Sequence, residues 1–188
     1  MSDVKELLKE RTQLFDDLYS GIIPKRIPIS VGMPIELCIQ KAGLDLAKTQ
    51  WTREGLEEAL EAVIKNMKSD SLPSDSYRVP LYHQIMGSIG IVMSKTGFMQ
   101  HPEITTLYED EYDEFIANPY DCLIEKIFPR IYTALGGDPI RRSIVFAAAI
   151  KANADVRSEM SQIYAKIADK YGFYVPNPAY ASRSLAPF

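Results

Sequence analysis

Hydrophobic residues recur at helical spacing along much of the chain. Apolar side chains three or four positions apart predict a helix over 3–19, and Gly21 is placed to end it. The same spacing predicts a short helix over 34–42, which begins with a proline, and a strongly patterned helix over 52–67. We therefore expect the first third of the chain to be mainly helical.

The C-terminal half shows the same pattern. A capping box and an apolar side predict a helix over 106–116, and a further helix begins at Asn118 and kinks at Pro129. A third pattern covers 140–171, where we expect a break near 153–155 because an unbroken helix would be roughly 50 Å long. Helical spacing also predicts buried rings for Tyr108, Tyr112, Tyr120, Tyr132 and Tyr164.

Two stretches differ from this helical pattern. Residues 25–31 are rich in β-branched side chains, and Pro28 suits the start or the edge of a strand. In 77–102 no helical stripe is visible, and 89–93 is the best strand candidate. Glycines in this stretch permit close backbone approach, which predicts strands and ligand-facing loops here.

Composition restricts the class of protein. The 188 residues are 46% hydrophobic and 24% charged, as in a globular domain, and the net charge of −4 argues against a nucleic-acid partner. Cys38 and Cys122 form neither a disulfide framework nor a CxxC motif, which favours a reducing compartment. The N-terminus is polar, and no apolar run reaches the ~18 residues of a membrane span. A cytoplasmic protein without membrane contact is expected.

Four polar residues are candidates for substrate binding. His83 and Gln84 are adjacent, while His101 and Glu103 would place an imidazole and a carboxylate near a strand end, where barrel enzymes hold their catalytic groups. The alternative is that these residues are structural. His101 would then cap the following helix or bond to the backbone, and His83 and Gln84 would make hydrogen bonds within the fold. The two histidines lie in no HExxH or HxC motif, so no metal site is expected from this chain alone.

Several strings resemble one known family. LYSGIIPKRIP (18–28), TGFMQHPEI (96–104), DEYDEFI (110–116) and NPYD (118–121) resemble the uroporphyrinogen decarboxylase-like superfamily. They are most similar to its branch of corrinoid-dependent methyltransferases from anaerobic bacteria. The resemblance spans nearly the whole chain, although none of these strings is a catalytic signature.

The resemblance implies an α/β, helix-rich fold that is the N-terminal portion of a (β/α)8 barrel. One region would then cover the chain 1–188, as the N-terminal part of a longer domain. Within it, an N-terminal helix occupies 1–24, the first strands and helices 25–102, a helical segment 103–172, and the start of a further element 173–188. The apolar, aromatic end of the sequence agrees with this expectation.

The resemblance also separates two activities. Uroporphyrinogen decarboxylases grip substrate carboxylates with an arginine-rich N-terminal string, whereas this chain offers only Lys25 and Arg26 there. This difference favours methyl transfer between a small methylated substrate and a cobamide carried by a partner protein, with zinc bound in the C-terminal half of the complete enzyme. The 188-residue piece alone would then be inactive. The alternatives are a decarboxylase of tetrapyrrole biosynthesis with Arg26 as a substrate contact, and a non-catalytic helical binding module.

Overall fold

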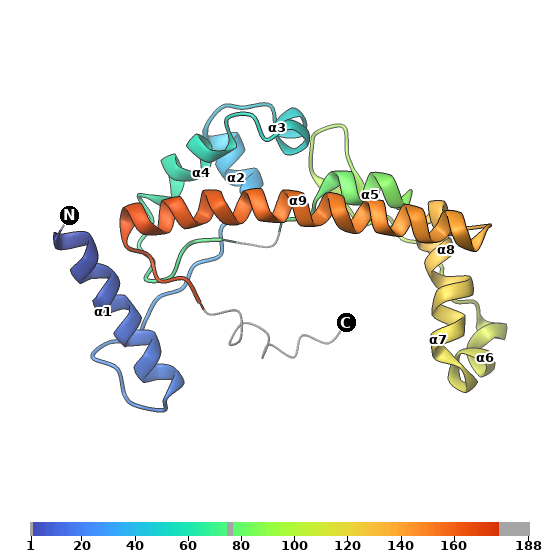
Figure 1. The fold of residues 1–188 in the computed structure, drawn as a ribbon, viewed down its shortest axis with the longest axis horizontal. Coiled ribbons are helices and arrows are strands. Elements are labelled where there is room, and N and C mark those ends of the chain that lie inside the picture. The colour runs from blue at the N-terminus through green and yellow to red at the C-terminus, as the bar shows by residue number, and fades with distance from the viewer. Residues whose placement is uncertain (1, 75–76, 177–188) are drawn as a thin grey trace. The chain divides into compact units, whose positions relative to one another are not determined.

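The computed structural model describes residues 2–74 and 77–176, and helices dominate them (Figure 1). The α-helices are α1 (Ser2–Tyr19), α2 (Ile35–Lys41), α3 (Leu46–Thr52), α4 (Leu56–Ile64), α5 (Pro80–Met86), α6 (Tyr112–Ala117), α7 (Pro119–Cys122), α8 (Phe128–Ile131) and α9 (Pro139–Tyr171). The shorter elements are strands β1 (Val92–Met93) and β2 (Met99–Gln100), the 3-10 turns η1 (Glu109–Glu111) and η3 (Thr133–Leu135), and the π-helical turn η2 (Leu123–Ile127). Of the helices in this described part, none is both long and apolar enough to cross a membrane.

The chain divides into two compact units. The first unit contains the described residues of 1–44, 55–77 and 160–188, and the second unit contains 45–54 and 78–159. Helix α9 contributes to both, because its residues up to Glu159 belong to the second unit and those from Met160 belong to the first. Each unit is therefore assembled from segments that are far apart in the sequence.

Helices α2 and α4 pack against each other in the core of the first unit. Cys38 and Ile39 on α2, and Leu56, Leu60 and Ile64 on α4, are almost completely inaccessible to solvent. The apolar periodicity of α4 thus produces one buried face, as the helical spacing predicts. Burial also raises the pKa of the Cys38 thiol to about 11, so this cysteine stays protonated at neutral pH.

Ion pairs join the outer side of α4 to the last turns of α9. Lys166 Nζ lies 2.9 Å from a carboxylate oxygen of Glu57, and Lys170 Nζ lies 2.5 Å from Glu61. The Tyr171 hydroxyl donates to the same Glu61 oxygen at 2.6 Å. These exposed pairs fix the register of the two helices more than they add to stability.

Two extended segments of the first unit run in the same direction. The Asp70 N–H donates to the Ile29 carbonyl at 2.7 Å. Four residues further along each segment, the Met33 N–H donates to the Ser74 carbonyl at 3.4 Å. Because both contacts advance by the same number of residues, the segment containing Ile29 is parallel to the segment containing Asp70.

A third extended segment adds to these two. Tyr174 and Ser71 form an isolated parallel bridge. In this bridge the Tyr174 N–H donates to the Asp70 carbonyl at 2.9 Å, and the Leu72 N–H donates to the Tyr174 carbonyl at 2.8 Å. Backbone bonding therefore places the central segment between Ile29 on one side and Tyr174 on the other.

The second unit contains a short hairpin and a small apolar cluster. Strands β1 and β2 are antiparallel, with Met93 opposite Met99. In the turn between them the Ser94 N–H donates to the Phe98 carbonyl at 2.8 Å. The apolar cluster centres on three buried residues with four partly buried neighbours: Met86, Leu135 and Ala149, with Tyr82, Ile85, Tyr132 and Val145.

A carboxylate at the start of α6 is held by one arginine. Both guanidinium nitrogens of Arg130 donate to Glu111, at 2.5 and 2.7 Å, and the Glu111 carboxylate accepts the Tyr108 N–H at 3.0 Å. The bonds from Arg130 are the main reason that the pKa of Glu111 falls to about 2.

We expect NMR titration to show this low pKa of Glu111 and the Arg130→Gln variant to return it towards 4.5. Because the folded-state pKa is depressed, the stabilising effect of Glu111 is present above 4.5 and is lost as pH falls towards 2.

Several predicted helices are confirmed. Helix α1 ends at Tyr19 before Gly21, whose φ of 73° is the left-handed conformation that glycine adopts easily. Helix α2 lies within the predicted range 34–42. The range 52–67 contains α4, but the predicted start was wrong, because Gly55 caps α4 and Thr52 ends the separate helix α3.

The predicted break in the last helix was wrong. Helix α9 runs unbroken from Pro139 to Tyr171 (Figure 1). Lys151 pairs with Asp155 at 2.6 Å, and the Arg157 Nε donates to Asn153 at 3.2 Å. These contacts between residues four positions apart support the helix where Asn153 and Asp155 were expected to interrupt it.

The strand predictions were only partly correct. Residues 25–31 form no strand element, although Ile29 is extended beside Asp70. Within 89–93, only Val92 and Met93 form a strand. The stretch 77–102 also contains the helix α5, which a pattern search misses because it has seven residues and buries only Pro80 and Met86.

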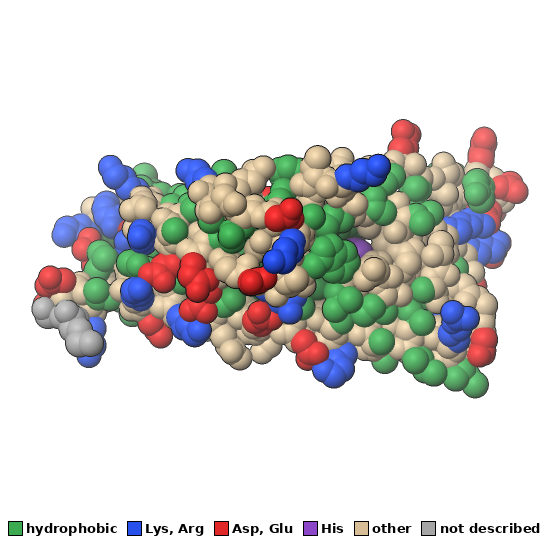
Figure 2. All heavy atoms as spheres, turned by 90° about the horizontal axis from the view of Figure 1, so that it is seen from above, with side chains coloured by type: hydrophobic (Ala, Val, Ile, Leu, Met, Phe, Trp, Pro, Cys, Tyr) green, Lys and Arg blue, Asp and Glu red, His purple; other side chains and the backbone are tan. Residues whose placement is uncertain are grey.

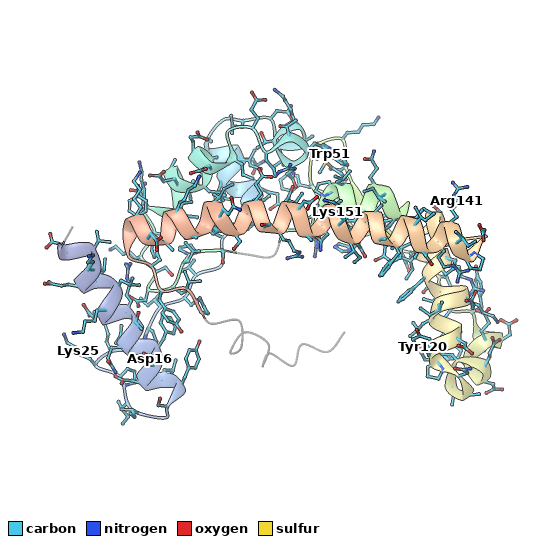
Figure 3. The ribbon with its side chains drawn as sticks, viewed as in Figure 1. Asp16, Lys25, Trp51, Tyr120, Arg141 and Lys151 are labelled. Carbon is cyan, nitrogen blue, oxygen red and sulfur yellow. The ribbon has the colours of Figure 1, made fainter. Side chains whose placement is uncertain are left out.

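Many apolar side chains predicted to face inward are exposed. Tyr108, Tyr112 and Tyr120 are 49%, 53% and 71% exposed. Ile144, which helical spacing over 140–171 also places on the inward side, is 64% exposed. Tyr120 is labelled in Figure 3. On the face seen in Figure 2, hydrophobic side chains lie among charged ones. Helical spacing gives the side of a helix on which apolar residues gather, but it does not show whether another element covers that side.

Candidate functional site

Arg26, a predicted substrate contact, is bonded to a buried carboxylate. Its Nη1 and Nη2 atoms donate to the two oxygens of Asp70 at 2.6 and 2.7 Å, and its Nε lies 3.8 Å from Glu10. The hydrogen bonds from Arg26 lower the pKa of Asp70 and raise the pKa of Arg26. The Asp70 carboxylate also accepts the Ile29 N–H at 2.8 Å. Arg26 therefore links the extended segment that contains Ile29 to the one that contains Asp70.

A second arginine, which the sequence did not single out, completes this cluster. The Nη1 of Arg11 donates to the carbonyls of Tyr171 and Gly172 at 3.1 and 2.7 Å, and its Nε lies 3.6 Å from Asp70. Its guanidinium also lies over the ring of Phe173, 4.8 Å from the ring centre. Arg11 thus fixes α1 to the end of α9. Asp70 is 44 positions from Arg26 in the sequence, a separation at which no local pattern connects two residues.

His83 and Gln84 lie together on α5, at a pocket of about 210 Å³ in the second unit. Trp51 from α3 also lines it and is labelled in Figure 3. Met93 and Met99 line it from the hairpin β1–β2. The remaining lining residues are Pro80, Ser88, Ile91 and Val92. We call this site the α5 pocket.

The hairpin turn holds α3 close to the α5 pocket. Gly97 in the turn has a φ of 88°, and a Cβ at this position would lie 2.7 Å from the Ala47 nitrogen and 2.8 Å from the Leu46 Cγ. The side chain of buried Gln50 donates to the Gly97 carbonyl at 2.6 Å. Only glycine permits this approach, which brings the Trp51 end of α3 to the methionines of the hairpin.

The His83 ring has an unusual environment. Its Nδ1 atom is buried and has no hydrogen-bond partner among the described residues. The ring packs edge-on against Tyr82, with 5.1 Å between ring centres. Burial, together with the positive charges of Arg78 and His101, lowers the pKa of His83 below its usual 6.5. The imidazole is therefore neutral at pH 7.

The structure brings some of the predicted site residues together. His83 and Gln84 share the α5 pocket, and His101 is the smallest of the three causes that lower the pKa of His83. His101 and Glu103 are exposed and do not line this pocket. Arg26 belongs to the first unit, where Asp70 holds it.

Zinc has no evident site in the part of the chain that the structure describes. Across residues 2–74 and 77–176, no three His, Cys, Asp or Glu side chains are grouped to hold a metal ion. Both Cys38 and Cys122 are buried free thiols. The zinc that the family resemblance implies was expected in the C-terminal half of the complete enzyme, and these residues are not assigned to it.

Comparisons with known proteins give no further guidance. No protein-family model, curated protein or solved structure matches the chain.

Proposed function

We propose that the chain forms the first part of a uroporphyrinogen decarboxylase-like barrel, and that the complete enzyme transfers methyl groups between a small methylated substrate and a cobamide protein. The observation that supports the fold is the parallel bonding of three extended segments, at Ile29, Ser71 and Tyr174. Parallel neighbours need long crossover connections, which are usually helical. The connection from Ile29 to Ser71 contains the helices α2, α3 and α4, and the connection from Ser71 to Tyr174 contains α5, the hairpin β1–β2 and the helices up to α9.

The chemistry of the site favours methyl transfer over porphyrinogen decarboxylation. An acidic tetrapyrrole needs several fixed cations to hold its carboxylates. Arg26 is bonded to Asp70, and no Lys or Arg is among the described residues that line the α5 pocket. The walls formed by Trp51, Met93 and Met99 suit a small, largely apolar molecule instead.

The described residues would have a limited role in this reaction. They would bind and orient the small substrate, with His83 and Gln84 as polar contacts and the indole of Trp51 as part of the apolar wall. The cobamide carried by the partner protein supplies the cobalt chemistry of methyl transfer when it is bound. No zinc or cobamide ligand is assigned to the described residues.

An assay of the complete reading frame tests this function. The purified gene product is mixed with a reduced corrinoid protein and a panel of methylated donors, and methylcobamide formation is followed by its visible spectrum. We expect donor-dependent methylation that is abolished when the corrinoid protein is omitted. Conversion of uroporphyrinogen without methyl transfer would establish the decarboxylase instead. If neither reaction occurs, the enzyme proposal is wrong and the non-catalytic binding module is favoured.

A further inference from the structure

We propose that copies of this chain associate through two different faces of the second unit, a basic face on the first part of α9 and an acidic face on α6 and α7. Both faces expose large apolar side chains, and their charges are opposite. This contact goes beyond methyl transfer and is independent of it, because it involves only copies of the chain.

The first part of α9 is apolar on two opposite sides. One side packs within the second unit, where Ala149 is completely buried and Val145 is partly buried. The opposite side carries exposed apolar residues that are three or four positions apart: Ile140, Ile144, Ala147 and Ala148. Ile140 is 72% exposed and Ile144 is 64% exposed. Because a helix that is apolar all round is normally buried all round, this outer side is expected to contact another protein surface.

The outer side of α9 also carries positive charge. The stretch 139–154 contains three cationic residues and no Asp or Glu. Arg141 and Lys151 are exposed on α9 (Figure 3). Arg141 makes no ion pair with the residues that the structure describes, and Lys151 pairs with Asp155, which is itself exposed. The basic face consists of these two cations and the four apolar residues of the outer side.

The acidic face has exposed apolar side chains of its own. Tyr112, Ile116 and Tyr120 are 53%, 75% and 71% exposed. Tyr112 and Ile116 are four positions apart and therefore lie on the same side of α6. Tyr120 belongs to α7, which contacts α6. A group of large apolar side chains exposed together, unlike a single one, marks an interaction surface.

Negative charge surrounds these apolar side chains. Residues 103–125 include eight Asp or Glu and no Lys or Arg. Three of these acids lie within three positions of Tyr112, are exposed, and make no ion pair with the described residues: Glu109, Asp110 and Asp113. The acidic face consists of these three carboxylates with Tyr112, Ile116 and Tyr120. It is complementary in charge to the basic face.

A second copy of the chain supplies the partner that each face requires. Two basic faces or two acidic faces would repel each other, because like charges across an interface are unfavourable. The basic face of one copy fits the acidic face of the next, with apolar residues in contact and the cations of α9 near the carboxylates. This head-to-tail contact uses two different surfaces, so one copy can bind two neighbours. Both faces are small, and we therefore expect weak association.

Sedimentation velocity of the 188-residue chain over a series of concentrations tests this contact. We expect the sedimentation coefficient to rise with concentration. Raising the salt from about 0.1 M to 1 M should weaken association about ten-fold, because the Debye length falls from about 10 Å to 3 Å. A chain that stays monomeric at every concentration would overturn the contact, and association that is insensitive to salt would overturn the role of charge.

Two variants, each with one altered face, identify the surfaces involved. Ile144→Asp adds a carboxylate to the basic face, and Ile116→Asp replaces the most exposed apolar residue of the acidic face. Each variant alone should stay monomeric where the wild type associates, with folding checked by circular dichroism. Mixed in equal amounts, the two should form a 1:1 dimer, because one retains an intact acidic face and the other an intact basic face. If no mixed dimer forms, head-to-tail pairing is wrong.

Ile150→Asp is the matched control. Ile150 is an isoleucine of the same helix and is 45% exposed. It is six positions from Ile144, which places it about 120° around the helix axis. This variant should associate like the wild type, and a loss equal to that of Ile144→Asp would refute the assignment of the outer side. None of these measurements uses a corrinoid protein or a methyl donor, so their failure is distinguishable from failure of the methyl-transfer assay.

Discussion

Replacing Asp70 by asparagine is expected to destabilise the first unit by about 3 kcal/mol, at the low end for a broken buried ion pair because Arg26 is partly exposed. The Asp70 carboxylate is 7% exposed and accepts both bonds from Arg26 as well as the Ile29 N–H. An asparagine would place an NH₂ group against one of these donors. It would also leave Arg11, whose side chain is 12% exposed, without its counterion. Urea unfolding followed by circular dichroism measures the loss.

The acid sensitivity of the protein gives an independent check on the same residue. Because the folded-state pKa of Asp70 is lowered, its stabilising effect is complete above the usual 3.8 and disappears as pH falls below that value. Wild type should therefore lose more stability than Asp70→Asn on acidification below 3.8. Asp16→Asn is the matched control, since Asp16 is an exposed residue of α1 (Figure 3). If the Asp70 and Asp16 variants lose the same stability, the contacts of Asp70 with Arg26 and Arg11 contribute little to the free energy of unfolding.

The sequence was most informative where structure is local. Spacing of apolar residues located α1, α2 and α4, because a helix bonds residues only four positions apart. The ends of these helices were less accurate. The start of α4 depends on the left-handed conformation of Gly55, at φ 74°, which the hydrophobic pattern does not contain.

Contacts between distant residues could not be predicted in the same way. The extended backbone at Ile29 is stabilised by Asp70, and the next parallel contact requires Tyr174. Ile29 itself is 51% exposed, whereas consecutive residues around Ser71 and Tyr174 are buried, so none of these short segments alternates between buried and exposed positions. The cluster of Arg26, Asp70 and Arg11 was missed for the same reason.

The candidate site was predictable only in part. The chemistry of their side chains was enough to select His83 and Gln84, and both line the α5 pocket. The apolar wall was not foreseen, because it requires the pairing of Met93 with Met99 and the approach of α3 to the hairpin turn. A two-residue strand is too short for alternation to show which side chains share a face.

Gly97→Ala is expected to destabilise the second unit by about 3 kcal/mol, the combined effect of backbone strain and steric overlap. The positive φ of 88° alone strains an alanine by roughly 1–2 kcal/mol. The new Cβ would also lie 2.7 Å from the Ala47 nitrogen and 2.8 Å from the Leu46 Cγ, so α3 must move away from the turn. That movement breaks the bond from Gln50 to the Gly97 carbonyl. Denaturant unfolding followed by the emission of Trp51 on α3 measures the effect directly.

Gly137→Ala separates the two causes of this instability. Gly137 belongs to the same unit and has a similar φ of 84°, but a Cβ there meets no heavy atom of the described residues within 4 Å. This variant should therefore show only the backbone strain of roughly 1–2 kcal/mol. Equal destabilisation in the two variants would mean that contact between α3 and the turn adds nothing beyond the conformation of glycine. A larger loss of stability at Gly97 would show that this contact holds α3, and with it the Trp51 wall of the α5 pocket, against the hairpin turn.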